Sequence, residues 1–232
     1  GQPAALNVSI SPADPGKVMV LMEVRSLDTG GLEEVVFNLA RSLDRDRFNV
    51  LIVCVEGGGH VARRCREHGI AVELLWGNKQ AEYDELLARY HVDLVCAHYS
   101  TFGAPLAAAK KIPLVCVVHN LYAWLPDDVF SELKSNDRYV SRYVAVSEGV
   151  ARYLTGRFNI FPERVSVIHN GLDVDALAAR EREPLICSRK DFGLSEDDYL
   201  FLHVAAITEV KGHNALIRAM KEIVQKYPQI KV

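Results

Sequence analysis

The sequence KVMVLMEVRSLDTGGLEEVVFNLARSL, residues 17–43, decides the fold class of this 232-residue chain. Residues 17–23 form an almost continuous apolar run, which is typical of a parallel strand covered on both faces. The pair Gly30-Gly31 then precedes a predicted amphipathic helix. Its apolar stripe recurs at helical spacing and consists of Leu32, Val35, Val36, Leu39, Ala40 and Leu43. A strand, a glycine-containing loop and a helix in this order are the first part of a βαβ unit.

Six further apolar runs of strand length follow, at residues 48–55, 70–75, 92–97, 112–118, 142–146 and 165–168. Helical patterns lie at residues 81–90, 102–110, 127–136 and 148–158, and Ser147 is the expected N-cap of the last of them. Alternating strands and helices predict an α/β fold, a doubly wound parallel sheet of the Rossmann-like type, with seven strands between residues 17 and 173.

The pattern divides the chain into four segments. Residues 1–16 are expected to form a flexible tail, residues 17–174 the Rossmann-like domain, and residues 175–198 a charged linker with one short helix near its start. The pattern of strands and helices resumes at residues 199–207, with a helix at 213–227 and the beginning of a strand at 229–232. A lone strand–helix pair cannot bury its own faces, so residues 199–232 are expected to begin a second, incomplete domain.

Composition excludes several classes of function. The formal net charge is −3 with acids and bases mixed along the chain, unlike the clustered basic excess of a nucleic-acid binder. No apolar run reaches the ~18–20 residues of a membrane-spanning helix, and residues 1–16 lack the features of a signal peptide. The five cysteines include no C-x-x-C pair, which predicts free thiols in a reducing compartment, the cytoplasm.

Polar residues follow the strands at the edge where a doubly wound sheet binds its ligands. If the strand order is 3-2-1-4-5, the crevice lies beyond the carboxyl ends of the first and fourth strands. His98 follows the fourth apolar run, His119 follows the fifth, and Gly30-Gly31 follows the first. Glycines before a helix N-terminus let a phosphate approach backbone N–H groups, although a tight turn without a ligand has the same sequence. Half-buried structural histidines are the alternative for His98 and His119, and no nearby spacing completes a zinc site.

The pair Lys211-Gly212 offers a second position for a phosphate. It follows the strand predicted at residues 199–207 and opens the helix predicted at 213–227. A lysine there can pair with a diphosphate while the helix N-terminus supplies backbone N–H groups. The alternative is an ordinary solvated loop lysine.

Five short stretches carry a family pattern: TGGLE (29–33), VVHN (117–120), VAVSE (144–148), VIHNGLD (167–173) and VAAITEVKG (204–212). In the order and spacing of these stretches, from about Val18 to its end, the chain resembles the retaining glycosyltransferases of family 4. These enzymes have the GT-B architecture of two Rossmann-like domains. The resemblance implies an N-terminal, acceptor-side domain followed by the start of a donor-binding C-terminal domain.

The resemblance implies a hexosyltransferase-type enzyme that moves a sugar from a nucleotide-diphosphate-sugar donor to an acceptor hydroxyl with retention of configuration. The acceptor would be a glycan, a lipid or a small molecule, in glycan, glycolipid or polysaccharide synthesis. No cofactor, no metal and no nucleic acid are implied. The expected location is the cytoplasm, with peripheral contact at the inner face of the membrane as an open possibility.

The resemblance also assigns roles to residues. His119 would be catalytic, contacting the transferred sugar and supporting the positive charge that develops at the anomeric carbon. Donor binding would involve Gly30, Gly31, Lys211 and Gly212. The cleft would further be lined by His98, Asn120 and Asn170. Because this cleft is expected to be open to solvent, loss of the His119 side chain should leave no buried partner without a hydrogen bond.

Two features depart from the family pattern. Ala205-Ala206 stand where the family usually has Gly-Arg, which removes a cation from the donor diphosphate and predicts altered donor affinity or donor choice. The E-x7-E element that holds the donor ribose and sugar would lie beyond Val232. The chain alone is therefore expected to have no transferase activity, because both walls of the cleft are needed.

Several alternatives stay open at this point. Asp44-Arg45-Asp46 and Asp173-Val174-Asp175 match the D-x-D string with which other glycosyltransferases bind a metal, but both also suit solvated turns. A nucleotide-sugar epimerase of the same architecture and a non-catalytic nucleotide- or sugar-binding or interaction module are the alternative functions. The aromatic segment 122–126 suits either the cleft edge or the core, and the basic segment 60–66 suits either anionic lipid or a solvated helix face.

Overall fold

The computed structural model describes residues 16–121, 127–184 and 186–232. The chain divides into two compact units, Gly1–Gly171 and Leu172–Val232, and each is described by itself. The predicted tail at 1–16, apart from Gly16, and the aromatic segment at 122–126 lie outside the described residues.

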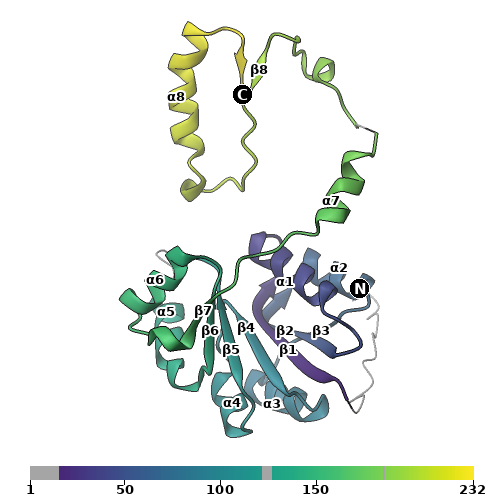
Figure 1. Cartoon of the computed structure of the whole chain (residues 1–232), viewed down its shortest axis with the longest axis vertical. Helices are drawn as coiled ribbons and strands as arrows, with labels where there is room; N and C mark the ends of the chain where they lie inside the picture. Colours follow the sequence, from purple (N-terminus) through teal and green to yellow (C-terminus); the bar gives the residue numbers. More distant parts are fainter. Residues whose placement is uncertain (1–15, 122–126, 185) are drawn as a thin grey trace. The chain divides into compact units, whose positions relative to one another are not determined.

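The first unit is built on one sheet of seven parallel strands in the order β3-β2-β1-β4-β5-β6-β7 (Figure 1). The strands are β1 (Val18–Leu27), β2 (Phe48–Gly58), β3 (Ala71–Leu74), β4 (Leu94–His98), β5 (Leu114–Val118), β6 (Arg142–Ala145) and β7 (Val165–Val167). Each strand coincides with one of the seven predicted apolar runs, so the predicted doubly wound sheet is confirmed. The strand order reverses between β1 and β4, as the predicted crevice requires.

Helices cover both faces of this sheet. One apolar cluster packs α1 (Gly31–Ser42) and α2 (His60–Glu67) on the sheet. The other includes residues of α3 (Lys79–Arg89), α4 (Ala104–Ala109), α5 (Asp127–Ser135) and α6 (Glu148–Arg157). Successive residues of β1 alternate between the two clusters, because side chains on a strand point to opposite faces in turn. This double burial explains why the strands are almost continuously apolar.

One predicted helix cap can be checked directly. The Ser147 side chain accepts a hydrogen bond from the backbone N–H of Val150 at 3.3 Å, which confirms the predicted N-cap of α6. Two 3-10 helices, η1 (Asp137–Tyr139) and η2 (Pro162–Arg164), lead into β6 and β7.

No helix in the described ranges is long and apolar enough to cross a membrane. All five cysteines are free thiols, as predicted.

The second unit contains α7 (Val174–Glu181), η3 (Arg189–Phe192), β8 (Tyr199–Leu200), η4 (Glu209–Lys211), α8 (His213–Lys226) and β9 (Ile230–Lys231). The short helix and the long helix appear where the sequence predicted them. The strand predicted at residues 199–207 is wrong beyond Leu200, because β8 pairs only with the two residues of β9. An apolar run needs a neighbouring strand along its whole length to form a ladder, and residues 201–207 have none in the described part of the chain.

Candidate active site

The sheet edge at the carboxyl ends of β1, β4 and β5 carries a cleft of about 400 Å³. Its lining comes from the ends of β1 and β2, the start of α1 and the residues that follow β4 and β5: Arg25, Ser26, Gly31, Leu32, Glu33, Glu56, Tyr99 and Asn120. The cleft lies at the reversal of strand order, where doubly wound sheets bind ligands. Of the predicted site residues, Gly31 and Asn120 form part of its wall.

Gly30 and Gly31 differ in the space that the structure leaves for a Cβ atom. Gly30 is the N-cap of α1, and a Cβ atom there would collide with the Glu33 carboxylate, which folds back over it. A Cβ atom on Gly31 would meet no atom within 4 Å, and Gly31 lines the cleft. Packing within the protein therefore gives no reason for glycine at position 31, whereas a ligand that approaches the backbone closely would.

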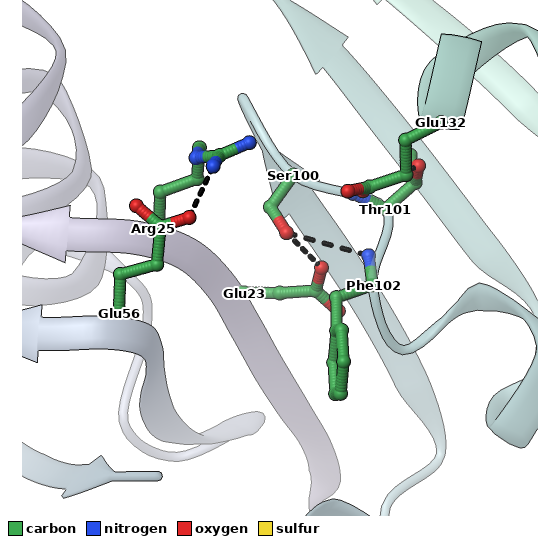
Figure 2. A network of polar contacts seen from close by, with 7 residues as sticks. All are labelled: Glu23, Arg25, Glu56, Ser100, Thr101, Phe102 and Glu132. Carbon is green, nitrogen blue, oxygen red and sulfur yellow. Dashed lines mark hydrogen bonds and ion pairs between the residues drawn. The ribbon is translucent and has the colours of Figure 1, made fainter. Parts of the chain in front are cut away.

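A β-bulge between β1 and β2 shapes the part of the cleft wall that carries Arg25 and Glu56. The register shifts after Val24, so that β2 has one extra residue before the pair Ser26–Gly57. Arg25 lies in this bulge and forms an ion pair with Glu56 (Figure 2). Bulges re-aim side chains at sheet edges and are frequent next to functional sites. Here the bulge supplies the cleft with an arginine whose charge is already balanced.

His98 and His119 meet at this edge. His98 ends β4 and shares a face of the strand with Cys96, two residues earlier. It pairs in register with Val117 of β5, which brings His119, two residues further on, beside it. Nδ1 of His98 lies 3.0 Å from Nε2 of His119, and the ring centroids are 5.2 Å apart in a stacked arrangement. Nε2 of His98 lies 3.3 Å from Sγ of Cys96.

The environment of this pair corrects two expectations. His98 was expected to line the cleft, but its side chain is fully buried and lies beneath the surface as the partner of half-buried His119. For the same reason, the expectation that loss of His119 strands no buried partner is wrong. Burial lowers the pKa of His98 to about 3, with a smaller contribution from His119, and lowers the pKa of His119 to about 4. Both rings are therefore neutral at pH 7.

These lowered pKa values predict a loss of stability in mild acid. Unfolded histidines bind a proton below about pH 6.5, whereas the folded rings stay neutral down to a pH of about 4 for His119 and about 3 for His98. The unfolded state binds more protons in this window, so the free energy of unfolding falls as the pH drops, by up to about 1.4 kcal/mol per pH unit for each ring. Urea unfolding at a series of pH values measures this slope. His98→Leu should reduce the slope by about half, and an unchanged slope would contradict a neutral His98.

A second buried polar group lies on the opposite face of the same switch point and was not among the residues predicted from the sequence. Glu23 of β1 is fully buried. Its carboxylate accepts hydrogen bonds from Tyr83 Oη at 2.7 Å, Ser100 Oγ at 2.5 Å and the backbone N–H of Gly103 at 2.9 Å. Burial raises the pKa of Glu23, and the hydrogen bonds from these three donors oppose the rise. The carboxylate thus ties β1 to α3 through Tyr83. It also ties β1 to the loop that follows β4 through Ser100, whose hydrogen bond to Glu23 is drawn in Figure 2.

The loop that follows β4, residues 99–103, is held from two sides. Its first residue, Tyr99, lines the cleft with φ 59°, in the left-handed region that non-glycine residues rarely adopt. From α5, Glu132 accepts hydrogen bonds from the N–H and hydroxyl of Thr101 at 3.0 and 3.2 Å. Asn136 Nδ2 donates to the carbonyl of Thr101 at 2.9 Å. Together with Glu23, these side chains fix the loop and the backbone position of Tyr99.

The remaining predicted site residues lie elsewhere. Asn170 is exposed and is not part of the cleft wall. Lys211 and Gly212 belong to the second unit, where Lys211 is exposed and Gly212 takes a left-handed φ of 73° at the start of α8. The left-handed backbone explains glycine at position 212 without a ligand. The role of both residues at a donor diphosphate stays a prediction.

The two D-x-D strings have local structural roles. The Asp44 carboxylate accepts a hydrogen bond from the N–H of Asp46 at 2.9 Å. The Asp173 carboxylate accepts one from the N–H of Ala176 at 2.9 Å and caps α7. Within the described residues, no group of three or more His, Cys, Asp or Glu side chains is arranged to hold a metal ion.

The basic segment at residues 60–66 forms most of α2 and uses two of its arginines inside the first unit. Arg64 pairs with Glu34 at 2.5 Å, and its guanidinium lies 4.1 Å from the centroid of the Phe37 ring. Arg66 donates a hydrogen bond to the carbonyl of Val72 at 2.8 Å. Arg64 thus contributes to the packing of α2 on α1, and Arg66 to the packing of α2 on β3.

Comparison with known proteins connects the chain to a family. A family model described as Glycosyltransferase Family 4 matches residues 29–176, more than half of the chain. D-inositol 3-phosphate glycosyltransferase from Nocardioides sp. is 26% identical over 156 residues, which is 61% of this chain and 33% of that protein. The chain spans about a third of the length of this and of two further curated D-inositol 3-phosphate glycosyltransferases.

Solved structures share the fold. A glycosyltransferase from Rickettsia africae matches with a TM-score of 0.71 at 19% identity, covering 92% of this chain and 62% of that one. HepE of Anabaena in complex with UDP matches with a TM-score of 0.66 at 20% identity, covering 88% and 57%. UDP-GlcNAc 2-epimerase from Methanocaldococcus jannaschii matches with a TM-score of 0.55 at 15% identity, covering 93% and 65%. At these identities the likeness concerns the fold, which both transferases and epimerases use.

The matched range begins at Thr29, directly before the glycine pair, and includes His98, His119 and Asn170. It therefore covers most of the switch-point edge and the cleft wall contributed by α1, β4 and β5. The relatives matched by sequence transfer sugars by name, and the fold is the Rossmann-like fold of glycosyltransferases. On this basis the chain belongs to Glycosyltransferase Family 4.

Proposed function

We propose that the gene product containing this chain transfers a sugar from a nucleotide-diphosphate-sugar donor to an acceptor hydroxyl, with retention of configuration. The cleft of about 400 Å³ at the β1–β4 switch point carries the proposal, because it joins an open glycine backbone to polar side chains at the place where this fold binds ligands. The UDP bound to HepE supports a uridine nucleotide as the first donor type to test.

His119 is the proposed contact to the transferred sugar. Its pKa of about 4 makes it a neutral hydrogen-bonding group at pH 7, so it would act by position and polarity and carry no charge of its own. Lys211 would pair with the donor diphosphate and offset the charge of the leaving nucleotide, with Gly212 opening the helix behind it.

The charges of the cleft wall favour hydroxyl groups as ligands. Arg25 is paired with Glu56, while Glu33 has no hydrogen bond or ion pair among the described residues. One arginine against two glutamates leaves these side chains without an excess of positive charge, and the two carboxylates can accept hydrogen bonds from the hydroxyls of a sugar or polyol. The proposed ligand at this wall is therefore a neutral, hydroxyl-rich group, as in a glycan, a glycolipid headgroup or a small polyol.

The test is a transfer assay on the gene product that contains this chain. A panel of UDP-, GDP- and ADP-sugars is incubated with sugar, polyol and glycolipid acceptors, and release of the nucleoside diphosphate and formation of the glycoside are measured. The proposal is supported if release of the nucleoside diphosphate depends on the acceptor and the glycoside formed has the same anomeric configuration as the donor sugar. Binding of nucleotide sugars without any turnover would instead favour a non-catalytic module.

The nucleotide-sugar epimerase is the second candidate, because an epimerase shares this fold. The same assay separates the two functions. An epimerase changes the nucleotide sugar in the absence of any acceptor, whereas a transferase requires the acceptor for sugar transfer. Acceptor-independent isomerisation of a UDP-sugar would replace the transferase proposal.

Gly31→Ala should impair binding without harming the fold. The new methyl group meets no protein atom within 4 Å but takes space at the cleft wall, so the KM for the ligand that contacts this wall should rise on the order of tenfold. The matched control is Gly156→Ala in α6, which also has no atom within 4 Å and lies outside the cleft lining. Steady-state kinetics and thermal midpoints are compared for both variants. Unchanged KM values in Gly31→Ala would contradict a ligand at this backbone.

A further inference from the structure

Cys96, His98 and His119 form a hydrogen-bonded line from the protein interior to half-buried His119, which precedes the cleft residue Asn120. Cys96 Sγ lies 3.3 Å from Nε2 of His98, and Nδ1 of His98 lies 3.0 Å from Nε2 of His119. A neutral imidazole has one N–H donor and one nitrogen acceptor. Because fully buried His98 uses both of its nitrogens in this line, the positions of the protons on the two rings are coupled.

Two arrangements of these protons are possible. In the first, the Cys96 thiol donates to Nε2 of His98, and Nδ1–H of His98 donates to Nε2 of His119. Every proton between the three side chains then meets a nitrogen lone pair. In the second, Nε2–H of His119 donates to Nδ1 of His98, and Nε2–H of His98 points at sulfur, which is a weak acceptor. The thiol proton then has no acceptor among the described residues.

The first arrangement satisfies the buried groups better. Burial raises the pKa of Cys96 to about 12, so the thiol keeps its proton at neutral pH and can donate it. Buried polar hydrogens are almost always paired with an acceptor, and leaving one unpaired is unfavourable. The line therefore has a direction, in which Cys96 donates to His98 and His98 donates to His119.

We propose that His98 is a positioning residue which, together with Cys96, holds His119 as its Nδ1–H tautomer. Nε2 of His119 is then used as the acceptor from His98, and Nδ1–H is the polar group left for a ligand. No described residue hydrogen-bonds to this Nδ1 atom. On the basis of the proposed function, the Nδ1–H tautomer makes His119 a hydrogen-bond donor to an oxygen of the transferred sugar. It gives the ring no free lone pair with which to act as a base or to support a positive charge.

The tautomer can be measured directly. The gene product containing this chain is labelled with ¹⁵N-histidine, and long-range ¹H–¹⁵N correlation spectra at neutral pH show which ring nitrogen carries the proton. The His119 signal is identified by its disappearance in His119→Asn. The expected result is a proton on Nδ1 of His119, and a proton mainly on Nε2 overturns the proposal.

Three variants test the source of this preference. Cys96→Ser keeps a donor of similar size and should keep the Nδ1–H tautomer. Cys96→Val removes the donor at similar volume and should shift His119 wholly or partly to Nε2–H, the form that imidazole prefers in water. His98→Leu should do the same and lower kcat on the order of 10–100-fold with little change in KM, because an orienting partner is lost.

An identical His119 tautomer in wild type, Cys96→Val and His98→Leu overturns the proposal. A shift in Cys96→Val without a shift in Cys96→Ser separates proton coupling from a simple loss of packing. The spectra need no substrate, so the tautomer stands or falls independently of the transfer assay. Sugar transfer with His119 in the Nε2–H form would overturn this inference alone and leave the proposed function intact.

Discussion

Replacing Glu23 with alanine is expected to lower the free energy of unfolding by at least about 3 kcal/mol, because three buried donors lose their acceptor and each costs about 1–3 kcal/mol. The donors are Tyr83 Oη, Ser100 Oγ and the N–H of Gly103. Urea unfolding of wild type and variant, followed by a signal from the first unit, measures the difference.

Two further variants serve as controls for Glu23→Ala. Glu56→Ala removes a carboxylate of the same edge whose side chain is 47% exposed, and it should cost less than about 1 kcal/mol. Glu23→Gln keeps the shape and one carbonyl acceptor, while its amide can donate to Ser100 Oγ, so it should regain most of the lost stability. A Glu23→Ala protein within about 1 kcal/mol of wild type would show that the carboxylate is not needed to hold the loop.

Replacing His119 with alanine is expected to lower kcat by about 10²–10³, as the loss of one preorganised polar contact in a transition state typically does. KM should change less, because the contact acts mainly in the transition state. The same variant should also lose about 1–3 kcal/mol of stability, since buried His98 is left without its partner. Steady-state kinetics of the gene product, with kcat expressed per folded molecule, separate the two effects.

The matched control is His169→Ala. His169 is exposed, contacts the carbonyl of Val146 at 3.1 Å and does not line the cleft. It should leave kcat within about twofold of wild type, as expected for a surface substitution away from the site. Full turnover per folded molecule in His119→Ala would remove His119 from the catalytic residues and leave it a structural partner of His98.

The apolar runs predicted the first unit well because helices cover both faces of the sheet, which makes most of its strands apolar along most of their length. The end of β1 was predicted at residue 23, since a carboxylate in an apolar run resembles a strand end. In the structure β1 continues to Leu27. The signal that was missed is the flanking sequence, because Glu23 lies between apolar Met22 and Val24, and a charged residue inside a buried run indicates a specific partner.

The candidate site was predictable in position but not in contacts. The order of strands and helices places Gly31, His98 and His119 at one edge, and the structure agrees. The direct contact of the two rings depends on the register that pairs His98 with Val117, which no short motif specifies. The partners of Glu23 lie 60 to 80 residues away in sequence, so only the folded chain brings them together.

The anchored loop after β4 has a consequence for ligand binding. Ordering the backbone of one residue costs about 1–2 kcal/mol of conformational entropy at 25 °C. Glu23, Glu132 and Asn136 hold residues 99–103 through hydrogen bonds within the protein itself, so this entropy is lost during folding and does not weaken binding later. A ligand therefore meets Tyr99 on a rigid surface. Such a wall selects ligands by their fit to a fixed shape, and adaptation to acceptors of different size has to come from other parts of the cleft.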